Sequence, residues 1–302
     1  MSSIIDVSGL TKSFNEITAV DNLTFTVKEK GVYGFLGQNG AGKSTTIRML
    51  LSLIKPTNGE IRIFGLDLSI HRREILQRTG AIIEKPDLYK YLTAYENLRL
   101  FAAMSGVKVT SKKLNEQLAQ VGLAERPHSK VKTFSQGMKQ RLGIATALVH
   151  DPQLIILDEP TNGLDPQGIA DMRNLILQLS NERGKTLMVS SHLLSEMELI
   201  ADSMLIIDKG RKVVEGKSAA LLNPEKLEVE LETDSNEKVM AIISNSEWQT
   251  HFVRVTDGAI IFEMSKSRIP ELNRYLVNNN VNVMSLRPKH SLEDYFLSLT
   301  RN

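Results

Sequence analysis

Short apolar runs alternate with stretches of helical spacing over roughly the first 222 residues of this chain. Continuous apolar runs stand at Val32–Leu36, Leu154–Leu157, Leu187–Val189 and Leu205–Ile207. Such runs are typical of strands that are buried on both faces of a parallel sheet. From Lys43 the apolar spacing becomes that of a helix, with Ile54 still on its face and Pro56 expected to end it. Strands and helices that alternate in this way indicate an α/β fold.

The pattern changes twice along the chain. Between about residues 85 and 150 the strand pattern fades, and we expect a helical subdomain inserted between strands. After Asn223-Pro224 the expected order is strand, helix, strand, strand, helix, strand, as in a small ferredoxin-like unit. Asp257-Gly258 predicts a hairpin turn there, and Ser291 with Asp294 predicts the capping box of a last helix. We therefore divide the chain into a domain of residues 1–222 and an accessory α+β domain of residues 223–302.

Composition narrows the possible functions. The chain has 302 residues, 41% hydrophobic and 24% charged, which suits a globular protein with a sizeable core. Its formal net charge is only +2, so no strong field favours nucleic acid. The absence of cysteine excludes disulfides and thiolate-bound metals. No apolar run approaches the roughly 18–20 residues that span a bilayer, and the early Asp6 argues against a secretory signal. Any action at a membrane should need a partner.

A glycine-rich loop follows the strand at Val32–Leu36 and precedes the helix from Lys43. Its sequence, Gly-Gln-Asn-Gly-Ala-Gly-Lys-Ser over residues 37–44, matches the phosphate-binding P-loop pattern. Glycines let the backbone turn so that its N–H groups face phosphates, and the helix N-terminus adds positive potential. Lys43 can reach the β- and γ-phosphates, and the hydroxyl of Ser44 suits Mg²⁺. A glycine-rich turn without a ligand is the alternative interpretation, which the strand–loop–helix context disfavours.

A second element of the same chemistry is the strand Leu154–Leu157, which ends in Asp158 and Glu159. Ligands of parallel sheets bind at the carboxyl ends of the strands. Asp158 would hold Mg²⁺, through water, and Glu159 would act as the general base on the water that attacks the γ-phosphate. Acids are also common at solvated strand ends, so the pair gains its meaning from the P-loop.

The segment Phe134–Arg141, Phe-Ser-Gln-Gly-Met-Lys-Gln-Arg, resembles the signature motif of the ABC ATPase family, usually Leu-Ser-Gly-Gly-Gln. It departs from that motif at Phe134, Gln136 and Met138. The resemblance implies that Ser135 and Gly137 contact the γ-phosphate of an ATP molecule held by the opposite subunit. Ser135 is equally expected to cap a helix, and the two roles are compatible, because a helix N-terminus also attracts anions.

Further motifs extend the resemblance over residues 1–222, in the family's order. Thr161–Pro166 resembles the D-loop, which contains Asp165 and crosses the dimer interface. His192, in Ser190-Ser191-His192, resembles the switch histidine that hydrogen-bonds the γ-phosphate. Phe14 matches the aromatic position that stacks on adenine, although a core phenylalanine is the alternative. The resemblance thus implies a P-loop NTPase fold of the ABC type and a head-to-tail dimer that encloses two ATP molecules.

The site residues that follow fall into three groups. The catalytic ones are Glu159, His192 and Lys43. The nucleotide-binding ones are Phe14, Gly37, Gln38, Asn39, Gly40, Ala41, Gly42, Lys43, Ser44, Thr45, Glu84, Ser135, Gly137 and Asp165. The expected Mg²⁺ ligands are Ser44, Asp158 and Glu84.

Glu84 is a departure from the family pattern, which has glutamine at this position of the Q-loop. A carboxylate is still an oxygen ligand for Mg²⁺, but it repels the polyphosphate. We expect Glu84→Gln to bind ATP more tightly than the native chain when Mg²⁺ is chelated. The alternative is that Glu84 points to solvent or to a membrane partner, so that the substitution changes nothing.

The segments Ile83–Pro86, Leu92–Leu98 and Ser291–Phe296, with Phe134–Arg141, resemble the ATPases of bacitracin- and lantibiotic-resistance exporters. This resemblance implies an ATP-hydrolysing exporter subunit that dimerises and drives a separately encoded permease from the cytoplasmic side of the membrane. The segment from about Glu84 to Arg99 would contact that permease. An importer subunit and a non-transport ABC ATPase are the alternatives. The near-neutral charge and the single ATPase unit argue against the latter.

Overall fold

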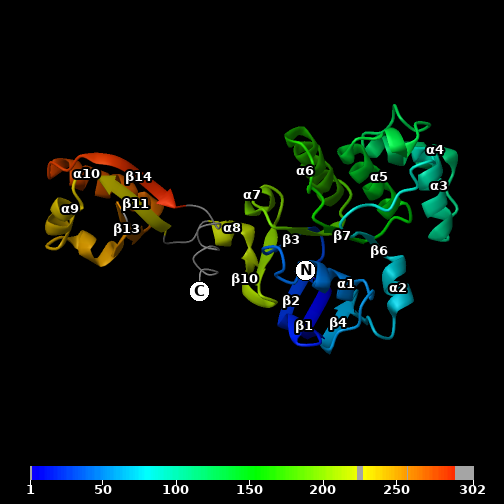
Figure 1. Ribbon diagram of the computed structural model, residues 1–302, viewed down its shortest axis with the longest axis horizontal. Coiled ribbons are helices and arrows are strands. Elements are labelled where there is room, and N and C mark those ends of the chain that lie inside the picture. Colours follow the sequence, from blue (N-terminus) through cyan, green and yellow to red (C-terminus); the bar gives the residue numbers. More distant parts are fainter. Residues whose placement is uncertain (1, 223–226, 257, 290–302) are drawn as a thin grey trace. The chain divides into compact units, whose positions relative to one another are not determined.

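The computed structural model describes residues 2–222, 227–256 and 258–289. Over these residues the chain forms two compact units, divided between Lys217 and Ser218. Figure 1 gives their helices and strands. The predicted terminal helix at Ser291 lies outside the described residues, as does Asp257 of the predicted hairpin turn.

The first unit contains two sheets. The smaller is antiparallel, in the order β2-β1-β4-β5, and the larger has the order β10-β9-β3-β8-β7-β6. In the larger sheet every pairing is parallel except that of β10 with β9. The strands of the smaller sheet are β1 Ser3–Phe14, β2 Ile17–Lys28, β4 Asn58–Ile63 and β5 Leu66–Asp67. Those of the larger are β3 Gly31–Leu36, β6 Thr79–Ile82, β7 Leu154–Asp158, β8 Thr186–Ser191, β9 Ser203–Asp208 and β10 Arg211–Lys217.

The central strands of the larger sheet are buried on both faces, which explains their continuous apolar runs. All five residues of β7 and all six of β8 are buried. Alternate residues of β3 point to opposite faces, and its two aromatic side chains, Tyr33 and Phe35, share one core with Phe25 of the smaller sheet. Helix α1, Lys43–Leu50, contributes Ile47, Met49 and Leu50 to the same core. The P-loop is thereby anchored between two sheets.

Helix α1 is shorter than its apolar pattern predicts. It ends at Leu50 rather than continuing past Ile54 towards Pro56. The reason lies in Ser52, whose φ of 53° is left-handed, and in the backbone N–H of Leu53, which donates to the carbonyl of Arg48. Local backbone hydrogen bonds of this kind close a helix C-terminus.

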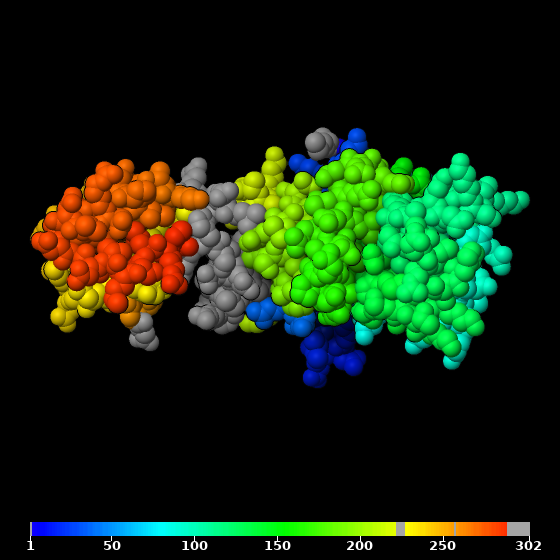
Figure 2. All heavy atoms as spheres, turned by 90° about the horizontal axis from the view of Figure 1, so that it is seen from above, coloured from blue at the N-terminus to red at the C-terminus, as the bar shows by residue number. Residues whose placement is uncertain are grey.

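A helical segment separates β6 from β7, as the fading strand pattern predicts. It contains α3 Ala94–Met104, α4 Ser111–Gln120, a 3₁₀ turn at Val131–Thr133 and α5 Gln136–Leu148. In the space-filling view its residues, coloured cyan to green, gather in one lobe of the first unit (Figure 2). The other helices of this unit are α2 Arg72–Gln77, α6 Pro166–Asn181 and α7 Leu194–Met197.

The second unit begins with α8, Ser218–Leu222, and then forms a four-stranded antiparallel sheet in the order β12-β13-β11-β14. Its core is formed by residues between Val229 and Val281, with Trp248 among them. This sheet order, with a helix after the first and third strands, is that of a ferredoxin-like unit. The elements are β11 Leu227–Thr233, α9 Asn236–Ile243, β12 Phe252–Thr256, β13 Ala259–Met264, α10 Ile269–Asn278 and β14 Val283–Lys289. Whether the domains fold independently at the expected boundary stays a prediction.

Candidate functional site

The P-loop joins the end of β3 to the start of α1. Gly42 is the N-cap of α1, with a φ of 103°, and a Cβ there would lie 2.5 Å from the carbonyl oxygen of Ala19. Only glycine meets both conditions. Gly40 also has a positive φ, 86°, but open space lies beside it. Residues 38–40 are exposed, while Gly37 and Ala41 on either side of them are buried. Ser44 and Thr45, partly buried, form the first turn of α1 with Lys43.

Lys43 is buried, with 5% of its surface exposed. Its ammonium donates to the backbone carbonyls of Gly37, at 2.6 Å, and Gln38, at 3.2 Å. It also lies 3.2 Å from Oε1 of Glu159. A buried charge needs partners of this kind, because desolvation is costly. The loop therefore holds its lysine beside the residue expected to act as the base.

His192 completes this arrangement from the end of β8. Its Nδ1 lies 2.8 Å from Oε2 of Glu159. A carboxylate only accepts, so Nδ1 carries the proton of this hydrogen bond. Because β8 lies between β3 and β7, Lys43, Glu159 and His192 meet at adjacent strand ends. Three residues that are far apart in the sequence thus form one connected cluster.

Asp158 lies next to this cluster and is completely buried. Its Oδ1 accepts a hydrogen bond from the hydroxyl of Ser190 at 2.5 Å, while its Oδ2 is buried and has no hydrogen-bond partner. A buried carboxylate oxygen without a partner costs free energy unless a cation or a water molecule is bound. Among the described residues no three His, Cys, Asp or Glu side chains gather as a metal site. Mg²⁺ suits such a sparse donor set, because it usually keeps waters and phosphate oxygens as its other ligands. Asp158 therefore fits Mg²⁺, and Ser44 as a further ligand stays a prediction.

Glu84 is not brought into this cluster. It follows β6, which pairs with β7, so the backbone reaches the expected edge of the sheet. Its carboxylate, however, accepts a hydrogen bond from Arg48 at 2.8 Å and is 62% exposed. The guanidinium of Arg48, on the exposed side of α1, attracts the carboxylate outward. Of the three expected Mg²⁺ ligands, Glu84 is the one that this geometry does not support, and its role stays a prediction.

Phe14 lies at the tip of the β1–β2 hairpin and is 47% exposed. A place in the core is therefore excluded. The ammonium of Lys12 lies 4.9 Å from the centre of its ring. An exposed aromatic ring can stack on a planar base.

Three further expected site residues lie outside the cluster around Lys43. Ser135 is the N-cap of α5 and accepts a hydrogen bond from the backbone of Met138. Gly137 leaves open space, since a Cβ there would meet only Leu164, at 3.9 Å. Asp165 caps α6 through the backbone N–H of Gly168. Both helix N-termini are thus well formed.

The part played by Ser190 is not predicted by the sequence, in which Ser190 stands only as a neighbour of His192. Its hydroxyl contacts both Asp158 and the backbone of Glu159. Asn97 was also missed. This fully buried side chain exchanges hydrogen bonds with the backbone of Tyr89, donating to its carbonyl and accepting from its N–H. An asparagine within a helical pattern gives no signal of such a contact, which depends on where the chain returns.

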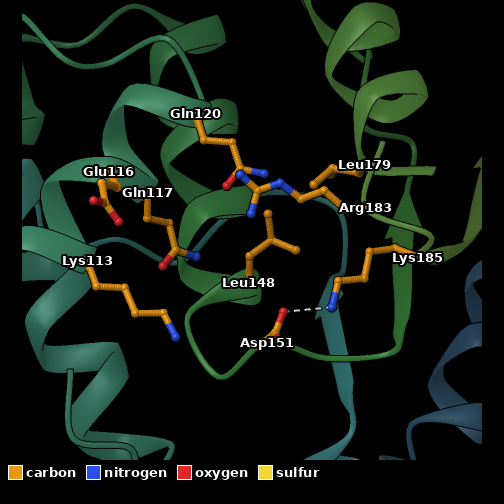
Figure 3. A pocket seen from close by; sticks show the side chains of 9 residues that line it. All are labelled: Lys113, Glu116, Gln117, Gln120, Leu148, Asp151, Leu179, Arg183 and Lys185. Carbon is orange, nitrogen blue, oxygen red and sulfur yellow. Dashed lines mark hydrogen bonds and ion pairs between the residues drawn. The ribbon is translucent and has the colours of Figure 1, made fainter. Parts of the chain in front are cut away.

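A polar hollow of about 230 Å³ lies between α4, the end of α5 and the end of α6 (Figure 3). Lys113, Arg183 and Lys185 line it together with Asp151. Lys185 donates to Asp151 at 2.7 Å, and this hydrogen bond is the main reason that the pKa of Asp151 is below its usual range. One ion pair, Lys185 with Asp151, thus lies in the hollow, and no expected site residue lines it.

Comparison with known proteins fits this geometry. Residues 20–162 match the family model described as ABC transporter. The bacitracin transport ATP-binding protein BcrA of Bacillus licheniformis is 44% identical over 301 residues, which are 99% of this chain and 98% of that protein. The chain belongs to the ABC transporter family. The lantibiotic transport ATP-binding protein SrtF of Streptococcus pyogenes is 42% identical over 224 residues, 74% of this chain and 95% of its own.

Solved structures of the ABC family agree with the fold. One, the ATP-binding subunit of an ABC transporter, is 32% identical and has a TM-score of 0.65 over 72% of this chain and 91% of its own. Another, an ATP-binding cassette in a dimeric post-hydrolysis state with ADP and Pi, is 26% identical, with a TM-score of 0.64 over 71% of this chain and 98% of its own. The predicted P-loop NTPase fold of the ABC type is confirmed. This member of the family is an ATP-hydrolysing subunit of an ABC transporter.

Proposed function

We propose that this chain is the motor of an exporter, in which Lys43, Ser44, Asp158, Glu159 and His192 hydrolyse Mg²⁺-ATP and dimer closure drives a separate permease. The observation that carries the proposal is the cluster in which Lys43 and His192 both contact the carboxylate of Glu159. It joins a phosphate-binding group, a candidate base and a candidate phosphate sensor at one edge of a parallel sheet.

The roles within the site follow from charge and position. Lys43 and the backbone of residues 37–42 bind the phosphates, Ser44 and Asp158 hold Mg²⁺, and Phe14 stacks on the base. Bound Mg²⁺ supplies neutralisation of phosphate charge. Glu159 accepts the proton of the attacking water. Because Glu159 accepts the Nδ1 proton, His192 can donate to a phosphate only as the imidazolium, which carries a second proton on Nε2.

Two copies are needed for a complete site. Ser135 and Gly137 stand at the N-terminus of α5, outside the cluster around Lys43, and a helix N-terminus attracts anions such as the phosphates of the partner's ATP. We infer a homodimer in which each copy supplies the α5 N-terminus to the other. The dimeric solved relative with ADP and Pi supports this arrangement.

The permease should contact the segment after β6. Tyr89 and Tyr91 are 52% and 81% exposed there. The hydrogen bonds of buried Asn97 fix the backbone of this segment, so its exposed aromatic side chains stand on a rigid base. Aromatic residues of this kind are enriched at protein interfaces. No helix among the described residues is long and apolar enough to cross a bilayer. We propose attachment to the cytoplasmic side of the membrane through this segment.

The relatives' names support export as the direction. Proteins similar to this chain carry the names bacitracin transport and lantibiotic transport ATP-binding protein, and we propose a related peptide-like cargo for this transporter. Tagged chain, isolated from its own membranes, tests the proposal. A polytopic membrane protein should co-purify, and Tyr89→Ser with Tyr91→Ser should abolish its capture while ATP binding persists. The proposal would be contradicted if ribosomes co-purified instead, or if the double variant captured the membrane protein as well as the native chain does.

A further inference from the structure

Ser190 occupies a position between the two acidic residues of the site. It is the fifth residue of β8, fully buried, and pairs directly with Asp158 in the parallel ladder with β7. Its Oγ lies 2.5 Å from Oδ1 of Asp158 and 2.9 Å from the backbone nitrogen of Glu159. One hydroxyl thus touches both the candidate Mg²⁺ ligand and the candidate base.

The direction of both hydrogen bonds is determined by their partners. The backbone N–H of Glu159 can only donate, so the hydroxyl of Ser190 accepts from it. The one proton of the hydroxyl is then available for Asp158, whose Oδ1 accepts it. No alternative arrangement satisfies both contacts. The hydroxyl is therefore oriented, although a serine hydroxyl usually rotates freely.

The contact with Asp158 decides which carboxylate oxygen is available to a cation. Oδ1 is engaged by Ser190, while Oδ2 is buried without a hydrogen-bond partner. Hydrogen bonds from neighbouring side chains to metal-binding carboxylates orient them and tune the affinity for the metal. Without the hydroxyl, both oxygens of a fully buried carboxylate would lack a partner, and nothing would fix the rotation of the carboxyl group.

The contact with Glu159 acts on the backbone. Glu159 has a φ of 49°, in the left-handed region that residues other than glycine rarely adopt. The hydrogen bond from its N–H to Ser190 holds the peptide at the point where this turn begins. The side chain of Glu159 is thereby directed towards Lys43 and His192.

We propose that Ser190 is a positioning residue, which fixes the metal-binding carboxylate of Asp158 and the backbone of Glu159 in one geometry. The proposal rests on the function proposed above, since it presumes a Mg²⁺-dependent hydrolysis at this site. A buried serine that only fills space between strands is the alternative. The two differ in the Mg²⁺ requirement, which a space-filling residue does not influence.

A matched control lies four residues earlier on the same strand. Thr186 is also buried, and its hydroxyl accepts a hydrogen bond from the backbone of Lys30, at the opposite end of β8. Ser190→Ala and Thr186→Val each remove one buried hydroxyl and leave one backbone N–H without its acceptor. Both should lower the melting temperature, but only Ser190→Ala should alter the metal site.

The experiment compares the full-length native chain, Ser190→Ala, Thr186→Val and the conservative Ser190→Thr. ATP hydrolysis is titrated with Mg²⁺, and binding of Mn²⁺ in the presence of ATP is followed by electron paramagnetic resonance. Ser190→Ala should raise the half-saturating metal concentration about 10-fold and lower kcat by about 10- to 100-fold. Ser190→Thr should bring the half-saturating metal concentration and kcat much of the way back to the native values. If the threonine variant does not fold, Ser190→Cys, which is closer in size to serine, is used in its place. ATP binding in EDTA should stay unchanged throughout.

Two failures can be told apart. If Ser190→Ala loses only thermal stability, as Thr186→Val does, and its metal titration matches the native chain, Ser190 has no positioning role. If the native chain itself hydrolyses ATP without regard to Mg²⁺, or does not hydrolyse it, the proposed function fails before Ser190 is considered.

Discussion

The ammonium of Lys43 lies 3.2 Å from Oε1 of Glu159, and both side chains are largely buried. The P-loop lysine and the candidate base therefore neutralise each other in this structure. Binding of a polyphosphate offers Lys43 a stronger partner, since a polyphosphate carries several negative charges and a carboxylate only one. The carboxylate of Glu159 then becomes available to the attacking water.

Lys43→Ala should lower ATP hydrolysis by about 100-fold or more, because it removes a cation that is placed where charge develops in the transition state. ATP affinity should fall as well. The chain should stay folded, since Glu159 keeps its contact with His192. A coupled-enzyme assay measures turnover, and circular dichroism checks the fold. Normal turnover in a folded variant would show that the nucleotide binds elsewhere.

The pairing of Glu84 with Arg48 gives a different expectation from the sequence alone. A carboxylate that is 62% exposed and satisfied by a guanidinium contributes little to a site that it does not face. We now expect Glu84→Gln to change ATP affinity by less than about twofold, with Mg²⁺ and in EDTA alike. A fluorescent ATP analogue reports both affinities. Tighter binding of ATP by the glutamine variant in EDTA would instead show that Glu84 lies near the γ-phosphate.

The ion pair of Lys185 and Asp151 predicts a pH-dependent stability. Chiefly through the hydrogen bond from Lys185, the pKa of Asp151 is lower in the folded chain. The stabilisation is therefore present above the ordinary aspartate pKa and is lost as the pH falls through the lowered folded value. Lys185→Met should cost less than about 1 kcal/mol at pH 7, because Asp151 is mostly exposed. Thermal melts should show this difference vanish at acid pH. A difference that is independent of pH would contradict the assignment.

Deletion of the chain after Leu222 should leave a folded domain that binds ATP. The core around α1 uses residues from Ile4 to Ile207, and the core of the second unit uses residues from Val229 to Val281, so no buried residue is shared. Separate cores are what independent domains require. Solubility, circular dichroism and ATP binding of residues 1–222 test this. A fragment that aggregates or does not bind ATP would show that the predicted boundary, or the independence of the domains, is wrong.

The sequence predicts most of this site because its chemistry is local. The P-loop and the pair Asp158-Glu159 depend on short segments whose residue types and strand context suffice. The contacts that link these segments cannot be predicted in this way, because the contacts depend on the order of the strands in the sheet. Ser190 meets Asp158 only because β8 lies beside β7, and sequence periodicity carries no information about neighbours in a sheet. Glu84 shows the same limit, since its partner Arg48 is 36 residues away.

The end of helix α1 at Leu50 differs from the sequence prediction for a related reason. Apolar spacing continues to Ile54, but the left-handed Ser52 ends the helix before it. Serine is common at such turns without requiring them. Backbone hydrogen bonds at the C-terminus of α1 determine where the helix ends, and the pattern of apolar residues does not indicate them.

Glu159→Gln tests the central claim most directly, because the amide keeps the size of the side chain but cannot accept the proton of the attacking water. Hydrolysis should fall at least about 100-fold, while ATP binding persists, and gel filtration with ATP and Mg²⁺ should show a stable dimer that the native chain forms only transiently. Lys43→Ala, which should not form this dimer, is the control. A Glu159→Gln variant that hydrolyses ATP at the native rate would contradict the assignment of the base.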